Sequence, residues 1–428
     1  MPKIRPFRAL RYNGDVVKDI SKVVAPPYDI IPPKLQNELY GRHPNNIVRL
    51  ILGKIKKADT AKDNRYNRAR SLLDKWTREG VLVREGKPAL YVYTQRYIYR
   101  GKTIDRLGFI GRMGLDLGNK TKILPHENTL LAPKLDRLNL TRATKCNLSP
   151  IFVLYEDEPR RVGPVLRRFI SGKRPAIDVN FEGVNNKVWV MDDPDSIKKV
   201  EKALGKSDVF IADGHHRYEV ARMYAREVEK KKVPASEKAS SKYTIAYFVE
   251  SEEKALTILP AHRAAKDIGA LSKAEAIRRL EKFFTIEKTA TLPKTMSRLE
   301  ALSGSHAFGM YMGGSDFYIL RLKDVKYSDN VIKDKPKDWK RLDVSILHLF
   351  IFQNVLGISD SDDNIDFFKS PEETYRSVRR GKFKIAFFLN PTKAWQVRRI
   401  AHIGECMPRK ATYFYPKPLS GLVINRHS

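Results

Sequence analysis

The chain has 428 residues, 42% of them hydrophobic and 10% aromatic, and its 81 Lys and Arg against 49 Asp and Glu give a formal net charge of +32. This length predicts two or three domains, and the composition is that of a folded protein rather than a disordered one. No run of about 18 uncharged apolar residues occurs, so no membrane span is expected. The first residues lack the apolar core and cleavage site of a signal peptide, which predicts a cytoplasmic protein.

Cys146 and Cys406 are the only cysteines, which argues against a disulfide framework and against a cysteine-based zinc site. The positive charge permits binding to nucleic acid, to an anionic membrane surface or to phosphorylated small molecules, and it does not choose among them. Lys and Arg occur in every segment, so much of this charge is expected on solvated surface.

Near the start of the chain is a turn-rich loop, Val23 to Asp29, whose prolines fix the backbone. A helix is expected in Ala61 to Gly80, because apolar residues recur there at helical spacing and Gly80 supplies a stop. The core-facing residues of this helix are Ala69, Leu72, Leu73 and Trp76.

A row of tyrosines, Tyr91, Tyr93, Tyr97 and Tyr99, alternates with apolar residues and predicts a strand. The turn Arg100 to Lys102 would return the chain into a second strand. Tyrosines beside basic residues also suit a stacking platform for single-stranded bases. The half-buried face of a sheet explains them more simply.

Farther along, a loop at Ile123 to Thr129 is followed by a basic amphipathic helix with Leu135, Arg137, Leu138 and Arg142. Short strands are expected at Ser149 to Tyr155 and at Val209 to Ala212. The second of these runs directly into Asp213-Gly214 and then into a helix that begins His215-His216-Arg217.

This strand, turn and helix favour an anion for physical reasons. A helix N-terminus presents unpaired backbone N–H groups and a partial positive charge. Gly214 allows close approach of the backbone, and Arg217 adds a planar fork suited to phosphate oxygens. Asp213 has two alternative roles, as the N-cap of the helix or as a ligand of Mg²⁺ beside phosphates. The simplest alternative for the whole segment is a capped helix with surface histidines.

The segment Phe210 to Glu219, together with Leu124-Pro125-His126-Glu127, resembles the ParB/SerK-like superfamily, whose SerK members are free-serine kinases. Over nearly its full length the chain also resembles the domain-of-unknown-function family ten-fifteen. The motifs that carry this second resemblance are Ala25 to Asp29, His126 to Thr129, Asp213 to Arg217 and the closing Met407 to Lys417.

The resemblance implies that Glu127 is the general base of a kinase. It also implies that Asp213, with Gly214, His215, His216, Arg217 and His126, binds the phosphates of ADP or ATP and, through Asp213, their Mg²⁺. Phosphoryl transfer needs mainly positioning and charge neutralisation, with a carboxylate placed to accept the hydroxyl proton. Serine is the acceptor that the resemblance implies, with phosphoserine as the substrate of the reverse reaction.

Further residues are candidates for contacting the substrate: Tyr28, Asp29, Thr129, Arg142, Asn147 and Ser149. His262 and Arg263 end a later strand-like run and are candidates for closing over the site. The dipeptide His126-Glu127 lacks the second histidine of a zinc-protease helix, and the glycines Gly108 to Gly118 form neither a Walker loop nor a Rossmann fingerprint.

These patterns predict an α/β (α+β) protein with mixed sheets. The expected domains are an N-terminal α/β domain at residues 1–105, a ParB/SerK-like phosphate-binding domain at 106–268 and a C-terminal α/β domain at 269–428.

The leading hypothesis is a small-molecule phosphotransferase that uses ADP or ATP. The alternatives are a ParB-like nucleotide switch associated with nucleic acid, which the net charge of +32 suggests, and a metabolite sensor without turnover. No helix-turn-helix, zinc-finger or RNA-recognition signature supports the nucleic-acid alternative.

Overall fold

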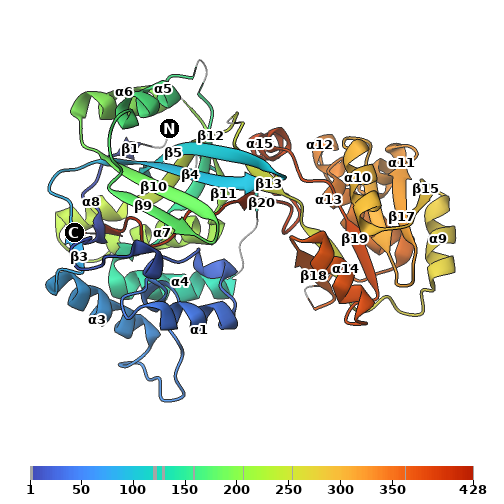
Figure 1. Cartoon of the computed structure of the whole chain (residues 1–428), viewed down its shortest axis with the longest axis horizontal. Helices are drawn as coiled ribbons and strands as arrows, with labels where there is room; N and C mark the ends of the chain where they lie inside the picture. The colour runs from blue at the N-terminus through green and yellow to red at the C-terminus, as the bar shows by residue number, and fades with distance from the viewer. Residues whose placement is uncertain are drawn as a thin grey trace. The chain divides into compact units, whose positions relative to one another are not determined.

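The computed structural model describes residues 3–118, 123–127, 131–157, 160–205, 207–252, 254–361 and 363–427. The chain forms two compact units (Figure 1). The first unit comprises Met1–Leu256 and Pro416–Ser428, and the second comprises Thr257–Tyr415. The sequence of the second unit is therefore inserted into that of the first.

A nine-stranded mixed sheet is the centre of the first unit. Its strand order is β6-β11-β8-β12-β5-β4-β10-β9, with β1 added to β5. Two pairs of neighbours, β6 with β11 and β8 with β12, are parallel, and the others are antiparallel. The strands are β1 (Ile4–Arg5), β4 (Leu90–Tyr99), β5 (Lys102–Gly114), β6 (Ile123–Leu124), β8 (Ile151–Tyr155), β9 (Ile177–Phe181), β10 (Val184–Met191), β11 (Val209–Asp213) and β12 (Tyr243–Glu250). The predicted α/β class with mixed sheets is confirmed.

Helices cover both faces of this sheet (Figure 1). Apolar residues of α5 (Val162–Ile170) and α6 (Pro194–Leu204) join the sheet in the main hydrophobic core, which removes their apolar faces from water. On the other face, α7 (His215–Glu229) packs against β8 and β12, and α4 (Leu131–Thr144) packs on α7. The remaining helical segments of this unit are η1 (Ile20–Lys22), η2 (Tyr28–Ile30), α1 (Pro33–Arg42), α2 (Val48–Ile51), α3 (Arg65–Arg78) and α8 (Ala235–Ser241).

The predicted helix at residues 61–80 appears as α3, with Ala69, Leu73 and Trp76 buried and Leu72 half-buried. Asn64 is its N-cap and accepts hydrogen bonds from the backbone of Tyr66 and Asn67, which explains why the helix begins later than the sequence suggested.

The tyrosine row belongs to the interior of the sheet. Tyr91 and Tyr93 of β4 are fully buried, and Tyr97 is almost so. The Tyr91 hydroxyl donates to the Phe7 carbonyl at 2.9 Å, and the Tyr93 hydroxyl donates to Asn186 at 2.6 Å. Rings that are packed and hydrogen-bonded in a core cannot stack on bases, so the stacking-platform alternative is wrong.

The C-terminal segment of the chain completes the first unit. Ser420 forms an isolated bridge with Ala25, and Ile424 forms one with Leu10. Short two-stranded pairs add β21 (Asn425–Arg426) to β7 (Cys146–Asn147), and β2 (Leu10–Tyr12) to β3 (Leu82–Arg84). Ser420 thus lies beside the proline-containing loop Val23 to Asp29.

The second unit is built on a six-stranded antiparallel sheet of order β15-β17-β16-β19-β14-β18. Its strands are β14 (His262–Ala265), β15 (Phe284–Thr289), β16 (Ala307–Tyr311), β17 (Phe317–Leu322), β18 (Ile365–Phe368) and β19 (Ile385–Phe388), and β13 (Thr257–Leu259) pairs separately with β20 (Tyr413–Tyr415). Residues 346–356 are mostly apolar and form a largely buried π-helix, η3 (Ile346–Leu356), of which Gln353 and Asn354 are exposed. The α-helices are α9 (Lys273–Glu281), α10 (Leu292–Ala301), α11 (Lys326–Val331), α12 (Lys337–Lys340), α13 (Asp343–Ser345), α14 (Pro371–Arg379) and α15 (Ala394–His402).

The two units differ from the three predicted domains. The predicted boundary at residue 105 falls inside β5, which pairs with β4 along its length. Because hydrogen bonds join strands on either side of that position, residues 90–99 and 102–114 belong to one sheet. Among the described residues, none of the helices is both long and apolar enough to cross a membrane.

Candidate functional site

Two neighbouring parallel strands bring the predicted motifs together. Val209 and Phe210 of β11 pair with Ile123 and Leu124 of β6. Both strands therefore end at the same edge of the sheet, and the residues that follow them leave it side by side. This pairing explains how His126-Glu127 reaches the start of α7, 89 residues later in the sequence at His215.

The start of α7 differs from one of the predicted alternatives. Gly214, and not Asp213, is the N-cap residue, and no side chain caps the helix. Its backbone has φ = 94°, in the left-handed region that glycine tolerates. A Cβ at this position would meet the Arg217 guanidinium at 2.8 to 2.9 Å. Glycine thus allows Arg217 to fold back over the helix end.

Asp213 joins a cluster of four charged side chains. Its carboxylate accepts a hydrogen bond from Arg217 at 2.6 Å and another from the Lys417 ammonium. Lys417 also donates to Asp29 at 2.9 Å. Two carboxylates and two cations therefore form one chain of ion pairs, Asp29–Lys417–Asp213–Arg217, which we call the charged cluster.

The charges in this cluster stabilise one another. The Lys417 side chain is 7% exposed, and burial alone would lower its pKa, but the charges of Asp213 and Asp29 outweigh burial and raise it. Burial would raise the pKa of Asp29, but Lys417 and Arg217 lower it to about 2. Lys417 is therefore an ammonium and Asp29 a carboxylate at neutral pH.

The sheet holds the backbone at Lys417 in place. Fully buried Arg106 of β5 donates to the Pro416 carbonyl, and Gln95 of β4 donates to the Lys417 carbonyl at 3.3 Å. Lys417 was missed among the predicted site residues because it lies 204 residues from Asp213 in the sequence. The available signal was its position as the last residue of the closing motif Met407 to Lys417.

A pair of buried histidines links α7 to Glu127. The His126 backbone N–H lies 3.3 Å from Nε2 of His215, and Nδ1 of His215 lies 3.7 Å from the Glu127 carboxylate. Burial lowers the pKa of His126 to about 4, and burial with the neighbouring His126 charge lowers that of His215. Because Nε2 accepts the backbone hydrogen bond, the neutral His215 ring carries its proton on Nδ1, facing Glu127.

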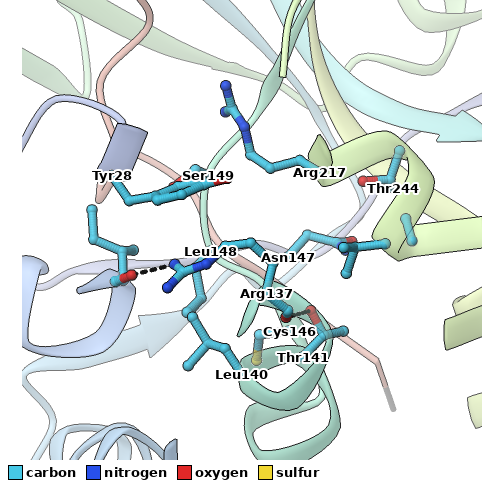
Figure 2. A pocket seen from close by; sticks show the side chains of 13 residues that line it. Tyr28, Arg137, Leu140, Thr141, Cys146, Asn147, Leu148, Ser149, Arg217 and Thr244 are labelled. Carbon is cyan, nitrogen blue, oxygen red and sulfur yellow. Dashed lines mark hydrogen bonds between the residues drawn. The ribbon is translucent and has the colours of Figure 1, made fainter. Parts of the chain in front are cut away.

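A small pocket adjoins the charged cluster through Arg217 (Figure 2). Its free volume is about 50 Å³, enough for a small polar group and too little for a whole nucleotide. The lining includes the predicted residues Tyr28, Asn147 and Ser149, along with Arg137.

Contacts within the protein hold these lining side chains in place. The Arg137 guanidinium lies 4.1 Å from the centre of the Tyr28 ring and donates to the Ile51 carbonyl. The Ser149 and Ser420 hydroxyls are 2.7 Å apart. Asn147 accepts a hydrogen bond from Asn425 at 2.8 Å. The C-terminal segment therefore contacts this pocket as well as the charged cluster.

Other predicted residues lie elsewhere. Arg142 does not line the pocket, because its guanidinium pairs with Glu227 of α7 at 2.5 to 2.9 Å on the surface. His262 and Arg263 are buried in β14 of the second unit. His216 is half-buried in the first turn of α7. Thr129 lies outside the described residues.

The predicted Mg²⁺ ligand, Asp213, already binds two cationic side chains. Among the residues that the structure describes, no group of three or more His, Cys, Asp or Glu side chains is placed to hold a metal ion. Protein sites for Mg²⁺ commonly use one or two carboxylates together with substrate phosphates and water. The arrangement fits a pair of carboxylates neutralised by Lys417 and does not fit a preformed metal site.

A family model described as "Protein of unknown function (DUF1015)" matches residues 4–345. The chain belongs to the DUF1015 family. The resemblance expected from the sequence motifs is thus confirmed for the family. No curated protein sequence matches this DUF1015 chain.

Solved structures show distant similarity to this DUF1015 protein. A conserved hypothetical protein from Pyrococcus furiosus is 13% identical, with 69% of this chain and 89% of that chain covered and a TM-score of 0.33. A free serine kinase in complex with AMP is 14% identical, with 68% and 83% covered and a TM-score of 0.32. SbnI from Staphylococcus aureus is 13% identical, with 71% and 83% covered and a TM-score of 0.32. Similarity at this level assigns no activity to the chain.

Proposed function

We propose that this protein is a nucleotide-dependent phosphotransferase that moves a phosphoryl group between ADP or ATP and the hydroxyl of a small molecule. The observation that carries the proposal is the meeting of Glu127 with the start of α7 through His215, whose Nδ1 lies 3.7 Å from the carboxylate. A carboxylate beside an anion-binding helix end is the combination that phosphoryl transfer requires.

The phosphates of the donor would bind at the start of α7. Its first backbone N–H groups receive no side-chain cap, and such groups together with the helix dipole favour phosphate oxygens. Arg217 and Lys417 are the cations of the adjoining cluster. Mg²⁺, where it takes part, would arrive on the phosphates of the nucleotide, and the protein residues would orient those phosphates.

The acceptor would be deprotonated by Glu127. Its hydroxyl oxygen attacks the terminal phosphorus, the bond from that phosphorus to the bridging oxygen of the donor breaks, and the hydroxyl proton passes to the Glu127 carboxylate. The Nδ1–H of neutral His215 faces this carboxylate and would hold it in position. Serine is the acceptor that the motif resemblance implies, and the small pocket beside Arg217 would take one polar group of such an acceptor.

The test is the rate of phosphoryl transfer with ATP or ADP and serine, followed by phosphorus NMR. Glu127→Gln should lower this rate by about 10²-fold or more, because the general base is lost. Glu201→Gln is the matched control, since Glu201 pairs with Arg5 at 3.2 Å on α6, and it should leave the rate unchanged. Equal rates in the two variants would remove Glu127 from the mechanism.

The second candidate is a nucleotide switch that associates with nucleic acid, which the formal net charge of +32 favours. In that case binding to DNA or RNA should weaken steeply as salt is added. A lack of binding at low salt would exclude it. A sensor without turnover would bind nucleotide normally and release no product in a single-turnover assay with labelled nucleotide.

A further inference from the structure

The second unit contains a larger cavity of its own. It lies among the loop before β16, the segment from α12 to α13, and the start of α15, and its free volume is about 250 Å³. The residues that carry its chemistry are Ser303, His306, Arg341, Asp343, Lys393 and Trp395. We propose that this cavity binds a nucleotide, with the base stacked on Trp395 and the phosphate held by Lys393 and Arg341.

His306 is held in a strained conformation at this cavity. Its backbone has φ = 48°, in the left-handed region that non-glycine residues rarely adopt. Its Nδ1 lies 2.8 Å from the Asp343 carboxylate. This contact orients the ring and leaves Nε2 as the nitrogen for a ligand. Backbone strain of this kind is concentrated where a side chain serves a binding site.

The cations of the cavity are only partly neutralised. Arg341 contacts Asp329 at 3.2 Å through one nitrogen, Nη2, and its side chain is 35% exposed. Lys393 is exposed and forms no ion pair within the described part of the chain. Arg399, by contrast, is held by Asp338 at 2.6 Å. Arg341 and Lys393 therefore retain donors for an anion, and a phosphate is an acceptor for both.

Trp395 supplies the surface for a ring. It is the second residue of α15 and is 50% exposed, although tryptophan side chains are usually largely buried. Every base has a π face that can stack on an indole, so this contact does not depend on which base is present. Asn390 donates one hydrogen bond to the Leu299 carbonyl at 2.7 Å, and its amide oxygen then remains as an acceptor for the edge of a base.

These features together select the ligand. A phosphate or carboxylate alone would explain Lys393 and Arg341 but not the exposed indole, and an apolar ligand would not explain the cations. A planar ring that carries a phosphate satisfies both, and a cavity of 250 Å³ suits one nucleotide better than a larger ligand. The nucleotide would be either a free nucleoside monophosphate or one unit of a single-stranded nucleic acid.

The test uses the full chain and titrates it with AMP, UMP, inorganic phosphate and a ten-residue oligodeoxythymidine, by calorimetry and by quenching of tryptophan fluorescence. Trp395→Ala and Lys393→Gln should each weaken binding by about tenfold, as loss of a stacking or phosphate contact does. Trp395→Phe keeps a ring and should restore most of the binding. Lys288→Gln is the matched control, because Lys288 is an exposed lysine of the same unit that pairs with Asp316 at 3.0 Å.

Each titration is repeated in an Arg217→Gln background, which separates this cavity from the site proposed in the first unit. Binding that persists there and weakens with Trp395→Ala supports the cavity, whatever the outcome for phosphoryl transfer. Tighter binding of oligodeoxythymidine than of the monophosphates identifies a single strand as the source, and the reverse identifies a free nucleotide. Three results overturn the proposal: no binding or quenching, binding that Trp395→Ala leaves unchanged, or inorganic phosphate binding as tightly as AMP.

Discussion

Lys417 offers the sharpest test of the charged cluster. Lys417→Met removes the ammonium that joins Asp29 to Asp213 and leaves a methionine of similar length. Removing one partner of a buried ion pair typically costs about 3 to 5 kcal/mol, because a buried charge is left uncompensated. The Asp213 side chain is 16% exposed and keeps Arg217, whereas that of Asp29 is 38% exposed and regains water. We therefore expect the lower end of this range, about 3 kcal/mol.

The measurement is the free energy of unfolding in urea. Lys335→Met is the control, because Lys335 pairs with Glu405 at the same distance of 2.9 Å but with its side chain 38% exposed, and such surface pairs contribute about 0 to 1 kcal/mol. The double variant Lys417→Met, Asp29→Asn should recover part of the loss, since Asp29 is the carboxylate that Lys417→Met leaves without a partner in the cluster, whereas Asp213 keeps Arg217. Equal costs for Lys417→Met and Lys335→Met would refute the view that the cluster is a buried, mutually stabilised group.

Two further predictions concern Gly214 and His126, which follow the ends of the paired strands β11 and β6. Gly214→Ala should destabilise the protein by more than Gly172→Ala, because both glycines have positive φ, at 94° and 71°, but only at position 214 does a Cβ meet a guanidinium at 2.8 Å. Gly172→Ala should cost about 1 to 2 kcal/mol, and equal losses in urea unfolding would show that Arg217 moves freely. Stability should also fall on acidification, since the pKa of His126 is about 4 in the folded protein and about 6.5 when unfolded. The unfolded chain then binds more protons between these values, so His126 contributes fully above pH 6.5 and loses about 2 kcal/mol by pH 5. His126→Gln should flatten the dependence of the urea midpoint on pH, and an unchanged slope would exclude this histidine as its cause.

The elements that the sequence predicted well are those with local signals. The strand Val209 to Ala212 and the helix after Gly214 correspond to β11 and α7, since a short apolar run, a glycine and a helical apolar face are readable within twenty residues. The prediction that Glu127 lies near the start of α7 rested on the resemblance of motifs. The physical cause of this position is the parallel pairing of β6 with β11. A strand of two residues such as β6 is too short to show a periodic pattern from which it could be predicted.

The sequence did not predict the roles of Lys417 and Ser420, because both contact residues that are far away along the chain. They belong to a segment that follows the second unit in the sequence and is part of the first unit. Periodicity and turn signals describe neighbours along the chain, and they carry no information on a contact across 388 residues such as that between Lys417 and Asp29. The boundary predicted at residue 105 has a different cause, because the turn at Arg100 to Lys102 does indicate the hairpin of β4 and β5, and the predicted boundary falls inside the second strand of that hairpin.

The bulk charge of +32 does not explain how a phosphate would bind beside α7. In the charged cluster, two carboxylates balance two cations, so an incoming phosphate meets no excess of side-chain charge there. It would have to bind through the uncapped N–H groups of α7 and replace a carboxylate as the partner of Lys417 or Arg217. Asp29 is the carboxylate that can be replaced at the lower cost. Its side chain is 38% exposed against 16% for Asp213, and Lys417 is its one partner in the cluster. Asp213, which keeps Arg217, would then remain to hold Lys417 toward the phosphate.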